Sequence, residues 1–319
     1  MNWNMSDWLG DDLRWDLANL RRYLETELAN LLRRYPIGSI EELVPQKGVL
    51  AYTDCYSPRL PQVQDALLDE HGAEACSAYN RLTLVRALEG FDPDVKVPDG
   101  LGGELVEEYR ARVAFIAEQV RSRPAADYGY MSDFFLKDLR VLGGASFPNL
   151  YQIVDMAAYL PPNFCRYDGW RENLRKLAFV HLRAGATRHG PFLRGHLDTR
   201  FTESFNEQGR LKAYARMADF MTRRPELRGI IGSTWYYDPN LERVSPHLRY
   251  LRAIFENNGA LFHRDGPGAV HTERALAKSR TRRRAFEAGE YQPCCYTVVW
   301  ARRDILRWHR RQAGVAARG

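Results

Sequence analysis

Leucines recur every three or four residues through residues 6–35 and form one apolar stripe along a helix. The stripe consists of Leu13, Leu17, Leu20, Leu24, Leu28 and Leu31. Ser6 is of a type that caps helix starts, and Pro36 cannot continue a helix. The pattern therefore predicts one long helix over 6–35, which could pack along a domain or join two copies of the chain as a homodimer.

Two more helical patterns follow in the first third of the chain. Residues 62–90 predict a helix with a break near Gly72, and residues 102–123 predict a helix that ends before Pro124. Between the first two helices, the stretch "KGVLAYTDCYSPRLP" predicts a short extended segment and a turn. Residues 1–130 are thus expected to form a helical N-terminal region.

Beyond about residue 130, short apolar runs that are typical of strands alternate with amphipathic segments. Strands are predicted near residues 176–183, 191–200, 227–237, 260–264 and 291–301. Helices are predicted at 206–224, 246–258, 272–288 and 302–313. This alternation implies some parallel pairing in a central sheet. The expected fold class is α+β, with the helical region packed on an α/β domain over 131–319.

The composition, 45% hydrophobic and 27% charged over 319 residues, is that of a soluble globular protein. No apolar run approaches the roughly 18 residues of a membrane span, and the N-terminus lacks the pattern of a signal peptide. The five cysteines follow no metal-binding spacing, and Cys294 and Cys295 are adjacent. We therefore expect a cytoplasmic protein without a disulfide framework and without a membrane partner.

The net charge of +6 is unevenly spread, since "RTRRR" (280–284) and "WARRDILRWHRR" (300–311) carry much of the excess. Such runs can bind the phosphates of a cofactor or an acidic carrier protein, and they are also typical of a solvated helix face. Arg282, Arg283 and Arg284 are the candidate cofactor-binding residues. Nucleic acid is not expected as a partner, because no recognisable binding module surrounds the basic helix.

A first candidate site is "RGHLDTR", in which His196, Asp198 and Arg200 alternate and would share one face of a strand. A histidine beside a carboxylate can act as a general base, and an arginine can hold an anionic group. The same histidine and aspartate could instead bind a divalent metal. His263 or His271 would then be the third ligand, with His181 and His189 as rivals. A strand end whose polar side chains bond one another is the third interpretation.

A second candidate site lies at the carboxyl end of the predicted strand 227–237, where ligands gather in α/β sheets. The expected substrate-binding residues are Ser233, Trp235, Tyr236, Asp238, Ser245 and His247. The aromatic rings would form an apolar wall with polar tips. Ser245 fits the N-cap of helix 246–258, Pro246 fits its first position, and Gly259 fits the residue past its end. The alternative is that the aromatic rings fill the core under a loop.

A third, weaker pattern is "RVLGGA" (140–145), which resembles loops that hold a pyrophosphate before a helix. Iron enzymes that use His-x-Asp mostly adopt a double-stranded β-helix, which the two helices predicted after residue 200 contradict. Walker loops, Gly-x-Ser-x-Gly elbows and His-Glu-x-x-His motifs are absent from the sequence.

The stretch "HLDTRFTESFNEQGR…RGIIGSTWYYDPNLERVSPHLRYLR" resembles a group of uncharacterised bacterial proteins, over roughly the last 130 residues. The order of elements from strand 191–200 to strand 291–301 resembles the second half of GNAT-type N-acyltransferases. This resemblance implies transfer of an acyl group from coenzyme A or a carrier protein to an amine, usually without a metal. Two features depart from it: the cofactor loop expected before helix 206–224 is missing, and a basic helix separates the last two strands.

Three hypotheses about function follow. The first is an N-acyltransferase in which His196 or Asp198 deprotonates the amine, Arg200 holds an anionic group, and acyl-coenzyme A or an acyl carrier protein is the donor. The second is a metal-dependent enzyme, such as a non-haem iron enzyme, that holds Fe(II) with His196, Asp198 and His263. The third is a non-enzymatic interaction protein.

Overall fold

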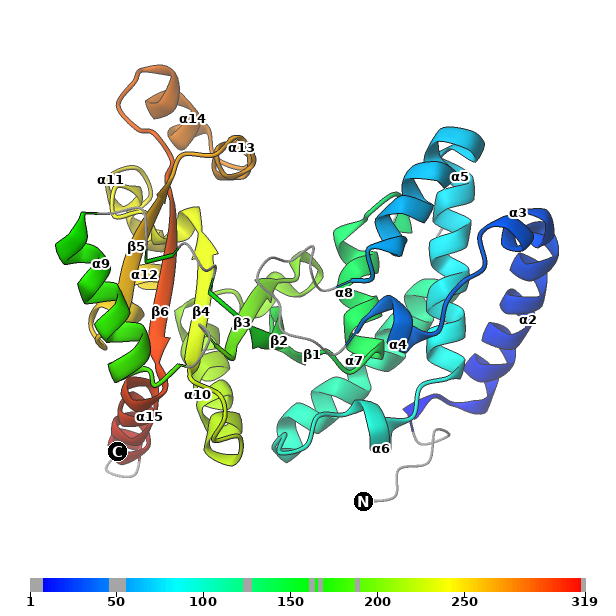
Figure 1. Cartoon of the computed structure of the whole chain (residues 1–319), viewed down its shortest axis with the longest axis horizontal. Helices are drawn as coiled ribbons and strands as arrows, with labels where there is room; N and C mark the ends of the chain where they lie inside the picture. Colours follow the sequence, from blue (N-terminus) through cyan, green and yellow to red (C-terminus); the bar gives the residue numbers. More distant parts are fainter. Residues whose placement is uncertain are drawn as a thin grey trace. The chain divides into compact units, whose positions relative to one another are not determined.

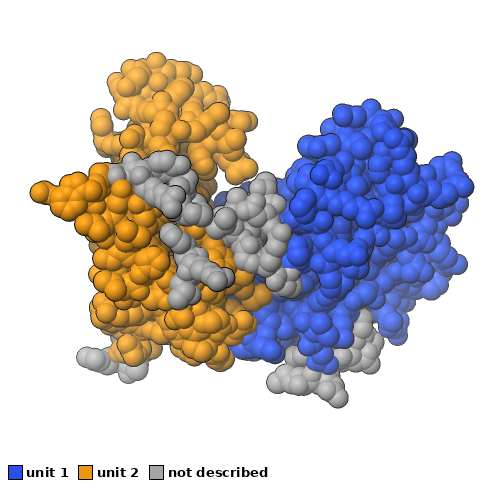
Figure 2. Space-filling view, in the orientation of Figure 1, with its two compact units in different colours: residues 1–155, 196–202 blue, residues 156–195, 203–319 orange. Residues whose placement is uncertain are grey.

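The computed structural model describes residues 8–45, 56–122, 128–160, 164–165, 169–186 and 190–316. The chain forms two compact units (Figure 2). Unit 1 comprises Met1–Asp155 and His196–Thr202, and unit 2 comprises Met156–Gly195 and Glu203–Gly319. A short segment around Asp198 thus belongs with the N-terminal helices. The division at residue 130, which follows the change of secondary structure, stays a prediction.

Unit 1 is mainly helical. Its helices are α2 (Asp11–Glu27), α3 (Ala29–Arg34), α4 (Ile40–Leu43), α5 (Arg59–Glu89), α6 (Pro93–Lys96), α7 (Gly103–Ser122) and α8 (Asp133–Leu142). Leucines of α2 and α3 pack against α5 in one buried cluster that includes Leu24, Leu31, Leu67 and Leu82. The second half of the apolar stripe predicted along the first helix, from Leu20 to Leu31, therefore packs in this cluster.

The expected single helix over 6–35 is wrong, because the helix is interrupted at Leu28 (φ −96°, ψ 10°), between α2 and α3. Leu28 is itself buried, so the leucine spacing continues across the interruption and does not reveal it. The proposed cap Ser6 lies outside the described residues, as does most of the segment 47–61. The break predicted near Gly72 is confirmed, since α5 is interrupted there by a φ of +80° that favours glycine.

The six strands form one mixed sheet, which together with the N-terminal helices confirms the α+β class (Figure 1). They are β1 (Ser146–Asn149), β2 (Gln152–Ala158), β3 (Phe192–Leu197), β4 (Gly229–Thr234), β5 (Leu261–Gly266) and β6 (Cys295–Ala301), in the order β1-β2-β3-β4-β6-β5. The parallel pairing that we expected joins β3 to β4. The pairs β1 with β2, β4 with β6, and β5 with β6 are antiparallel.

Helices cover both faces of the sheet in unit 2. The helices that follow β2 along the chain are α9 (Trp170–Leu177), the π-helix η3 (Ala178–Arg183), α10 (Glu207–Arg223), α11 (Leu241–Val244), α12 (Tyr250–Glu256), α13 (Ala269–Ala277), α14 (Arg280–Glu287) and α15 (Arg302–Ala316), with 3-10 turns η4 (Thr199–Ser204), η5 (Trp235–Tyr237) and η6 (Pro246–Leu248). Val180 of η3 packs in a buried cluster with Ile231 and Val299. On the opposite face, Trp300 packs edge-on against Tyr214 of α10 and Phe255 of α12.

Helix 206–224 is confirmed as α10, whose N-cap Asn206 accepts a hydrogen bond from the Gly209 N–H at 2.9 Å. Helix 302–313 is confirmed as α15. The strand predicted at 176–183 is wrong, because these residues are helical: they form the end of α9 and all of η3. A short apolar run does not distinguish a strand from a helical segment, and here the buried residues Lys176 and Val180 are four apart, as on a helix face.

Four other boundaries differ from the predictions. Strand 191–200 ends at Leu197, and strand 227–237 ends at Thr234; each continues into a 3-10 turn. Helix 246–258 is η6 followed by α12, and Ser245 makes no capping hydrogen bond, although Gly259 has the expected positive φ of +77°. Helix 272–288 is divided into α13 and α14 at Ser279, which caps α14. "RVLGGA" is followed by strand β1 instead of a helix, so it does not form the expected pyrophosphate loop.

Among the described helices, none combines the length and the apolar character that crossing a bilayer requires.

Candidate functional site

In unit 1, β2 and β3 bring Asp155 and His196 together. The His196 Nε2 lies 2.8 Å from Asp155 Oδ2. The other oxygen, Oδ1, accepts hydrogen bonds from Arg140 Nε and Nη2 at 3.0 and 2.8 Å and from Ser146 Oγ at 2.6 Å. The Asp155 side chain is only 1% exposed, whereas that of His196 is 20% exposed. The partly exposed imidazole of His196 thus lies between the buried carboxylate of Asp155 and the surface.

This carboxylate stays ionised. Burial raises the pKa of Asp155, but the charges of His196 and Arg140 and the hydrogen bonds from His196 and Ser146 outweigh it, and the pKa lies well below its ordinary value. The ionised Asp155 can accept a hydrogen bond from His196 Nε2 and fixes the orientation of the imidazole ring. The pair is therefore a histidine–carboxylate dyad that can accept a proton from a substrate.

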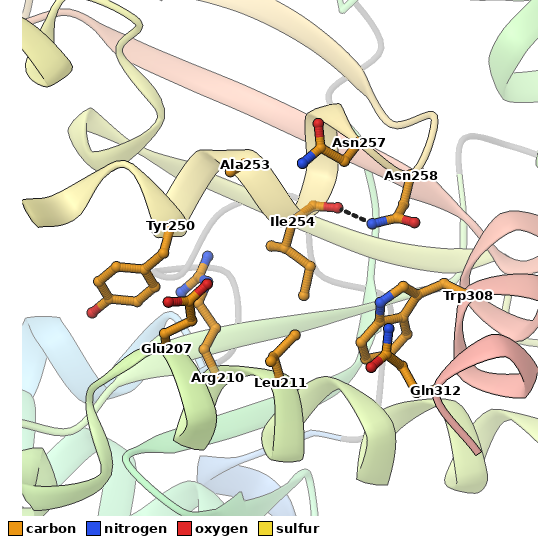
Figure 3. A pocket seen from close by; sticks show the side chains of 10 residues that line it. All are labelled: Glu207, Arg210, Leu211, Tyr250, Ala253, Ile254, Asn257, Asn258, Trp308 and Gln312. Atoms are coloured by element: carbon orange, nitrogen blue, oxygen red, sulfur yellow. Dashed lines mark hydrogen bonds between the residues drawn. The ribbon is translucent and has the colours of Figure 1, made fainter. Parts of the chain in front are cut away.

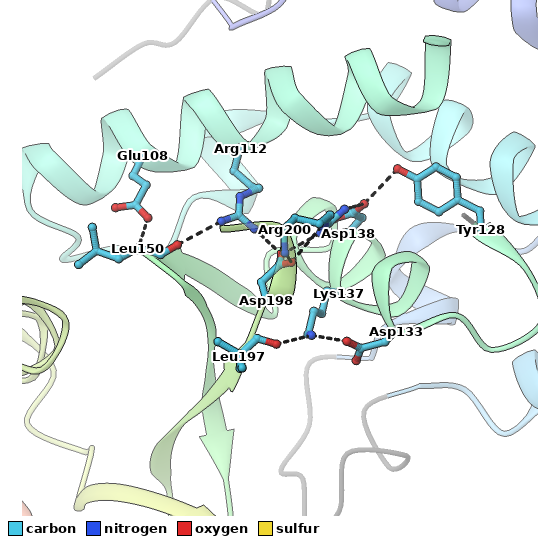
Figure 4. Close-up of polar contacts among 10 residues, drawn as sticks. All are labelled: Glu108, Arg112, Tyr128, Asp133, Lys137, Asp138, Leu150, Leu197, Asp198 and Arg200. Atoms are coloured by element: carbon cyan, nitrogen blue, oxygen red, sulfur yellow. Dashed lines mark hydrogen bonds and ion pairs between the residues drawn. The ribbon is translucent and has the colours of Figure 1, made fainter. Parts of the chain in front are cut away.

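Asp198, the predicted neighbour of His196, belongs to a separate buried network (Figure 4). Its Oδ2 accepts from Arg112 Nη1 at 2.7 Å, and both its oxygens accept from Arg200, at 3.0 and 2.8 Å. Arg200 also donates to the two oxygens of Asp138, at 2.8 and 2.6 Å. Asp138 and Asp198 are fully buried. Two carboxylates and two guanidinium groups therefore balance their charges inside unit 1.

The expected alignment of His196, Asp198 and Arg200 on one strand face is wrong, because β3 ends at Leu197. There Lys137 Nζ donates to the Leu197 carbonyl at 2.6 Å, and the Asp198 N–H donates to the Tyr151 carbonyl at 2.7 Å. Arg200 lies on η4 and stacks on the Phe134 ring at 4.7 Å. Neither Asp198 nor Arg200 is placed to meet a substrate directly.

The network makes the stability of unit 1 depend on pH. Burial raises the pKa of Asp198, but the hydrogen bonds and charge of Arg200 and the charge of Arg112 outweigh it, so the folded pKa is lowered. The stabilisation is therefore present above the unfolded pKa of about 3.9 and is lost as the pH falls through the folded value. We expect thermal melts followed by circular dichroism to show a falling melting temperature below about pH 4. Asp198→Asn, which cannot ionise, should show a shallower acid dependence; an unchanged slope would contradict this assignment.

In unit 2, hydroxyl groups connect three neighbouring strands. Thr297 Oγ1 of β6 donates to Asp265 Oδ2 of β5 at 2.8 Å. A hydroxyl has a single proton to donate, so the 2.5 Å contact between Ser233 Oγ of β4 and Thr297 Oγ1 has Ser233 as its donor. Burial raises the pKa of Asp265, against the hydrogen bond from Thr297 and the charge of His263. The exposed Ser233 is thus connected by hydrogen bonds through Thr297 to Asp265, a carboxyl group with a raised pKa.

The same face contains a buried lysine beside His263. Lys176 Nζ lies 2.6 Å from His263 Nδ1 and donates to the Phe164 carbonyl at 3.1 Å. The other ring nitrogen of His263 lies 3.7 Å from Asp265 Oδ1. Sequence reasoning missed Lys176, Asp265 and Thr297, because α9, β5 and β6 are far apart in the chain and no local motif links them.

The alternative metal set of His196, Asp198 and His263 does not fit a metal. Within the described ranges, no group of three or more His, Cys, Asp or Glu side chains is arranged to hold a metal ion. Asp198 is held by two guanidinium groups, and His263 contacts the amine of Lys176. Of the other candidate ligands, His181 Nδ1 contacts the Ala186 carbonyl at 2.9 Å, His271 lies on α13, and His189 lies outside the described residues.

The predicted substrate-binding residues lie mostly in packed positions. Trp235 is buried in a cluster with Leu241, Ala275, Ala285 and Tyr291, and Tyr236 lies against it with ring centroids 4.1 Å apart. Asp238 is buried and accepts from the N–H groups of Cys294 and Asn240 at 3.0 and 2.9 Å. Ser245 accepts from Arg282 at 2.9 Å, and His247 lies exposed on η6. Ser233 alone combines exposure with a connection to titratable groups.

The three arginines proposed for cofactor binding have different surroundings. Arg282 is buried, donates to the Ala275 carbonyl and to Ser245, and stacks on the Trp235 ring at 4.9 Å. Its guanidinium therefore joins α13, α14 and the segment before η6. Arg283 and Arg284 are exposed, so they can meet a partner from solution.

A pocket of about 200 Å³ lies between α10, α12 and α15 (Figure 3). Its lining comprises Glu207, Arg210, Leu211, Tyr250, Ala253, Ile254, Asn257, Asn258, Trp308 and Gln312. Arg210 is buried there and donates to Tyr237 Oη and the Leu251 carbonyl at 3.3 and 3.1 Å. The lining lacks histidine, serine and cysteine, and its titratable side chains are those of Glu207, Arg210 and Tyr250.

We found no significant match of the chain to a protein-family model, to a curated protein or to a solved structure.

Proposed function

We propose that the protein transfers an acyl group from a thioester donor to an amine. The observation that carries this proposal is the dyad of His196 and Asp155: a partly exposed imidazole with one ring nitrogen on a buried, ionised carboxylate. Such a dyad removes a proton from a nucleophile near neutral pH, which attack by an amine requires.

In this reaction the amine nitrogen attacks the thioester carbonyl and the imidazole of His196 takes its proton. The C–N bond forms, the C–S bond breaks, and the proton passes from the imidazolium to the leaving sulfur. Asp155 stays ionised and stabilises the imidazolium between these steps. No redox partner is required, and the products are an amide and a free thiol.

The position of the dyad in the sheet supports the proposal. β3 and β4 pair in parallel through Leu193 with Ile230 and Arg194 with Ile231, and α10 connects them. In α/β sheets, ligands bind outside the carboxyl ends of parallel strands, and His196 is next to the last residue of β3. The resemblance to GNAT-type N-acyltransferases, noted in the sequence, is part of the basis of this proposal.

Asp198 and Arg200 have a different part in this proposal from the one the sequence indicated. Their network holds the segment after β3 and thereby positions His196. Asp155 replaces Asp198 as the partner of the base.

The direct test is a transfer assay with the full-length protein. Decanoyl-coenzyme A and a decanoyl acyl carrier protein are each incubated with a panel of primary amines, and amide and free thiol are quantified. We expect equimolar amide and thiol with at least one donor and one amine. Thiol release without amide would indicate a thioesterase, and no turnover of either thioester across the panel would reject the proposal.

A further inference from the structure

A pair of short helices stands between β5 and β6. We refer to residues 269–287, which comprise α13, Lys278, Ser279 and α14, as the basic hairpin. In Figure 1 it projects beyond the ends of β5 and β6 in unit 2. It carries five exposed cations: Arg274, Lys278, Arg280, Arg283 and Arg284. This insertion is one of the two departures from the resemblance noted in the sequence.

The basic hairpin is firmly attached to the rest of unit 2. Arg282 and Ala285 point inward, where Arg282 bonds Ser245 and Ala285 joins the cluster around Trp235. With these two residues facing the core, helical geometry places Arg280, Arg283 and Arg284 on the outer face of α14. Arg283 also donates to the Ala277 carbonyl at 3.3 Å. The cations are therefore displayed by a rigid support.

Within the part of the chain that the structure describes, none of these five cations lies within 4.0 Å of a carboxylate oxygen. Other exposed arginines of this chain do form ion pairs, such as Arg34 with Glu70 and Arg249 with Glu242. Arg280 and Arg284 are four residues apart, a spacing at which like charges repel and destabilise a helix. An anionic partner bound to this face would relieve the repulsion between these positive charges.

The start of α10 is a poor site for the pyrophosphate of a nucleotide donor. A Cβ atom on Gly209 would lie 1.9 Å from the Ser204 carbonyl oxygen, so the preceding chain is packed closely over this turn. The Asn206 side chain occupies the Gly209 N–H, and Glu207 adds a negative charge to the first turn. The donor therefore has to be recognised elsewhere.

We propose that the basic hairpin docks an acidic carrier protein that presents the acyl donor as a thioester. This inference rests on the proposed acyl transfer and names the class of its donor. Carboxylates spaced three and four residues apart on a helix of the carrier match Arg280, Arg283 and Arg284 on α14. Glu287 lies on the same outer face, and this mixture of charges suits a protein surface better than a continuous line of phosphates.

The test measures binding separately from transfer. A fluorescently labelled decanoyl acyl carrier protein is titrated with the full-length protein, and its anisotropy is followed at low and high salt. We expect Arg284→Glu to weaken binding at least about tenfold and the triple variant Arg280→Glu, Arg283→Glu, Arg284→Glu to abolish it. Added salt should weaken wild-type binding, because exposed charges are screened.

The matched control is Arg310→Glu. Arg310 is an exposed arginine on α15, at the opposite end of unit 2, and its replacement changes the net charge equally (Figure 1). Binding should change less than about twofold. Equal losses in Arg284→Glu and Arg310→Glu, or no binding by the wild type, would overturn the inference. Tighter binding of transfer RNA through the same arginines would also overturn it, in favour of an RNA partner.

Failure of the docking inference and failure of the proposed function give different results. A carrier that binds through the basic hairpin but yields no amide would leave the docking surface standing and reject acyl transfer. Amide formation from decanoyl-coenzyme A alone, with no carrier binding, would support acyl transfer and reject the docking surface.

Discussion

Replacing His196 with glutamine is expected to lower kcat/KM for amide formation by roughly 10²–10⁴-fold at neutral pH, the usual contribution of a general base. The side-chain amide nitrogen of glutamine can still donate to Asp155, so the buried carboxylate keeps a partner and the fold is retained. What the variant loses is the second, basic ring nitrogen. The change therefore separates proton transfer from structural support.

The readout is kcat/KM for amide formation, with the melting temperature of each variant as the check that its fold is retained. The matched control is His309→Gln, because His309 Nε2 also lies 2.8 Å from a carboxylate, that of Asp219, on the surface of unit 2. A full rate in His196→Gln, or an equal loss in His309→Gln, would rule out His196 as the base.

Replacing Asp198 with asparagine is expected to destabilise unit 1 by about 3–5 kcal/mol, the usual cost of removing one partner from a buried ion pair. Arg112 and Arg200 would then share one buried carboxylate, that of Asp138, in a region that excludes water. For a unit of this size, the loss corresponds to a melting temperature lower by about 10 °C.

Thermal and urea unfolding measure this change, with Glu107→Gln as the control. Glu107 pairs with Arg110 on the exposed side of α7, one turn from Arg112, and surface pairs contribute little. A variant of Asp198 that melts like the wild type would show that the network does not stabilise unit 1. Below its melting temperature, Asp198→Asn should transfer more slowly than the wild type but faster than His196→Gln, since Asp198 holds the segment after His196 whereas Asp155 contacts His196 directly.

Features that depend on one residue and its near neighbours in the chain were predictable from the sequence. The break at Gly72 follows from the backbone freedom of glycine, and the helix at 206–224 follows from its apolar spacing and from Pro225 after its end. The interruption at Leu28 was not predictable, because Leu28 is buried like its neighbours and leaves the apolar spacing intact. Residues 176–183 were misassigned for a related reason, since a short apolar run suits a strand and a buried helix equally.

Contacts between distant residues were beyond the reach of local patterns. Arg112 and Asp198 are 86 residues apart, and Asp155 and His196 are 41 apart. The hydroxyl contact between Ser233 and Thr297 spans 64 residues. Each of these pairs forms because strands and helices from different parts of the chain are brought together, and a single sequence carries no record of that pairing.

The sequence by itself determined the α+β class, the parallel pairing implied by alternating elements, and the presence of a polar triplet near the end of a strand. Only the tertiary structure decided what the triplet does. β3 ends between His196 and Asp198, so the strand's alternation no longer keeps their side chains on one face. His196 therefore pairs with Asp155 on β2, while Asp198 and Arg200 join the buried charges around Arg112 and Asp138.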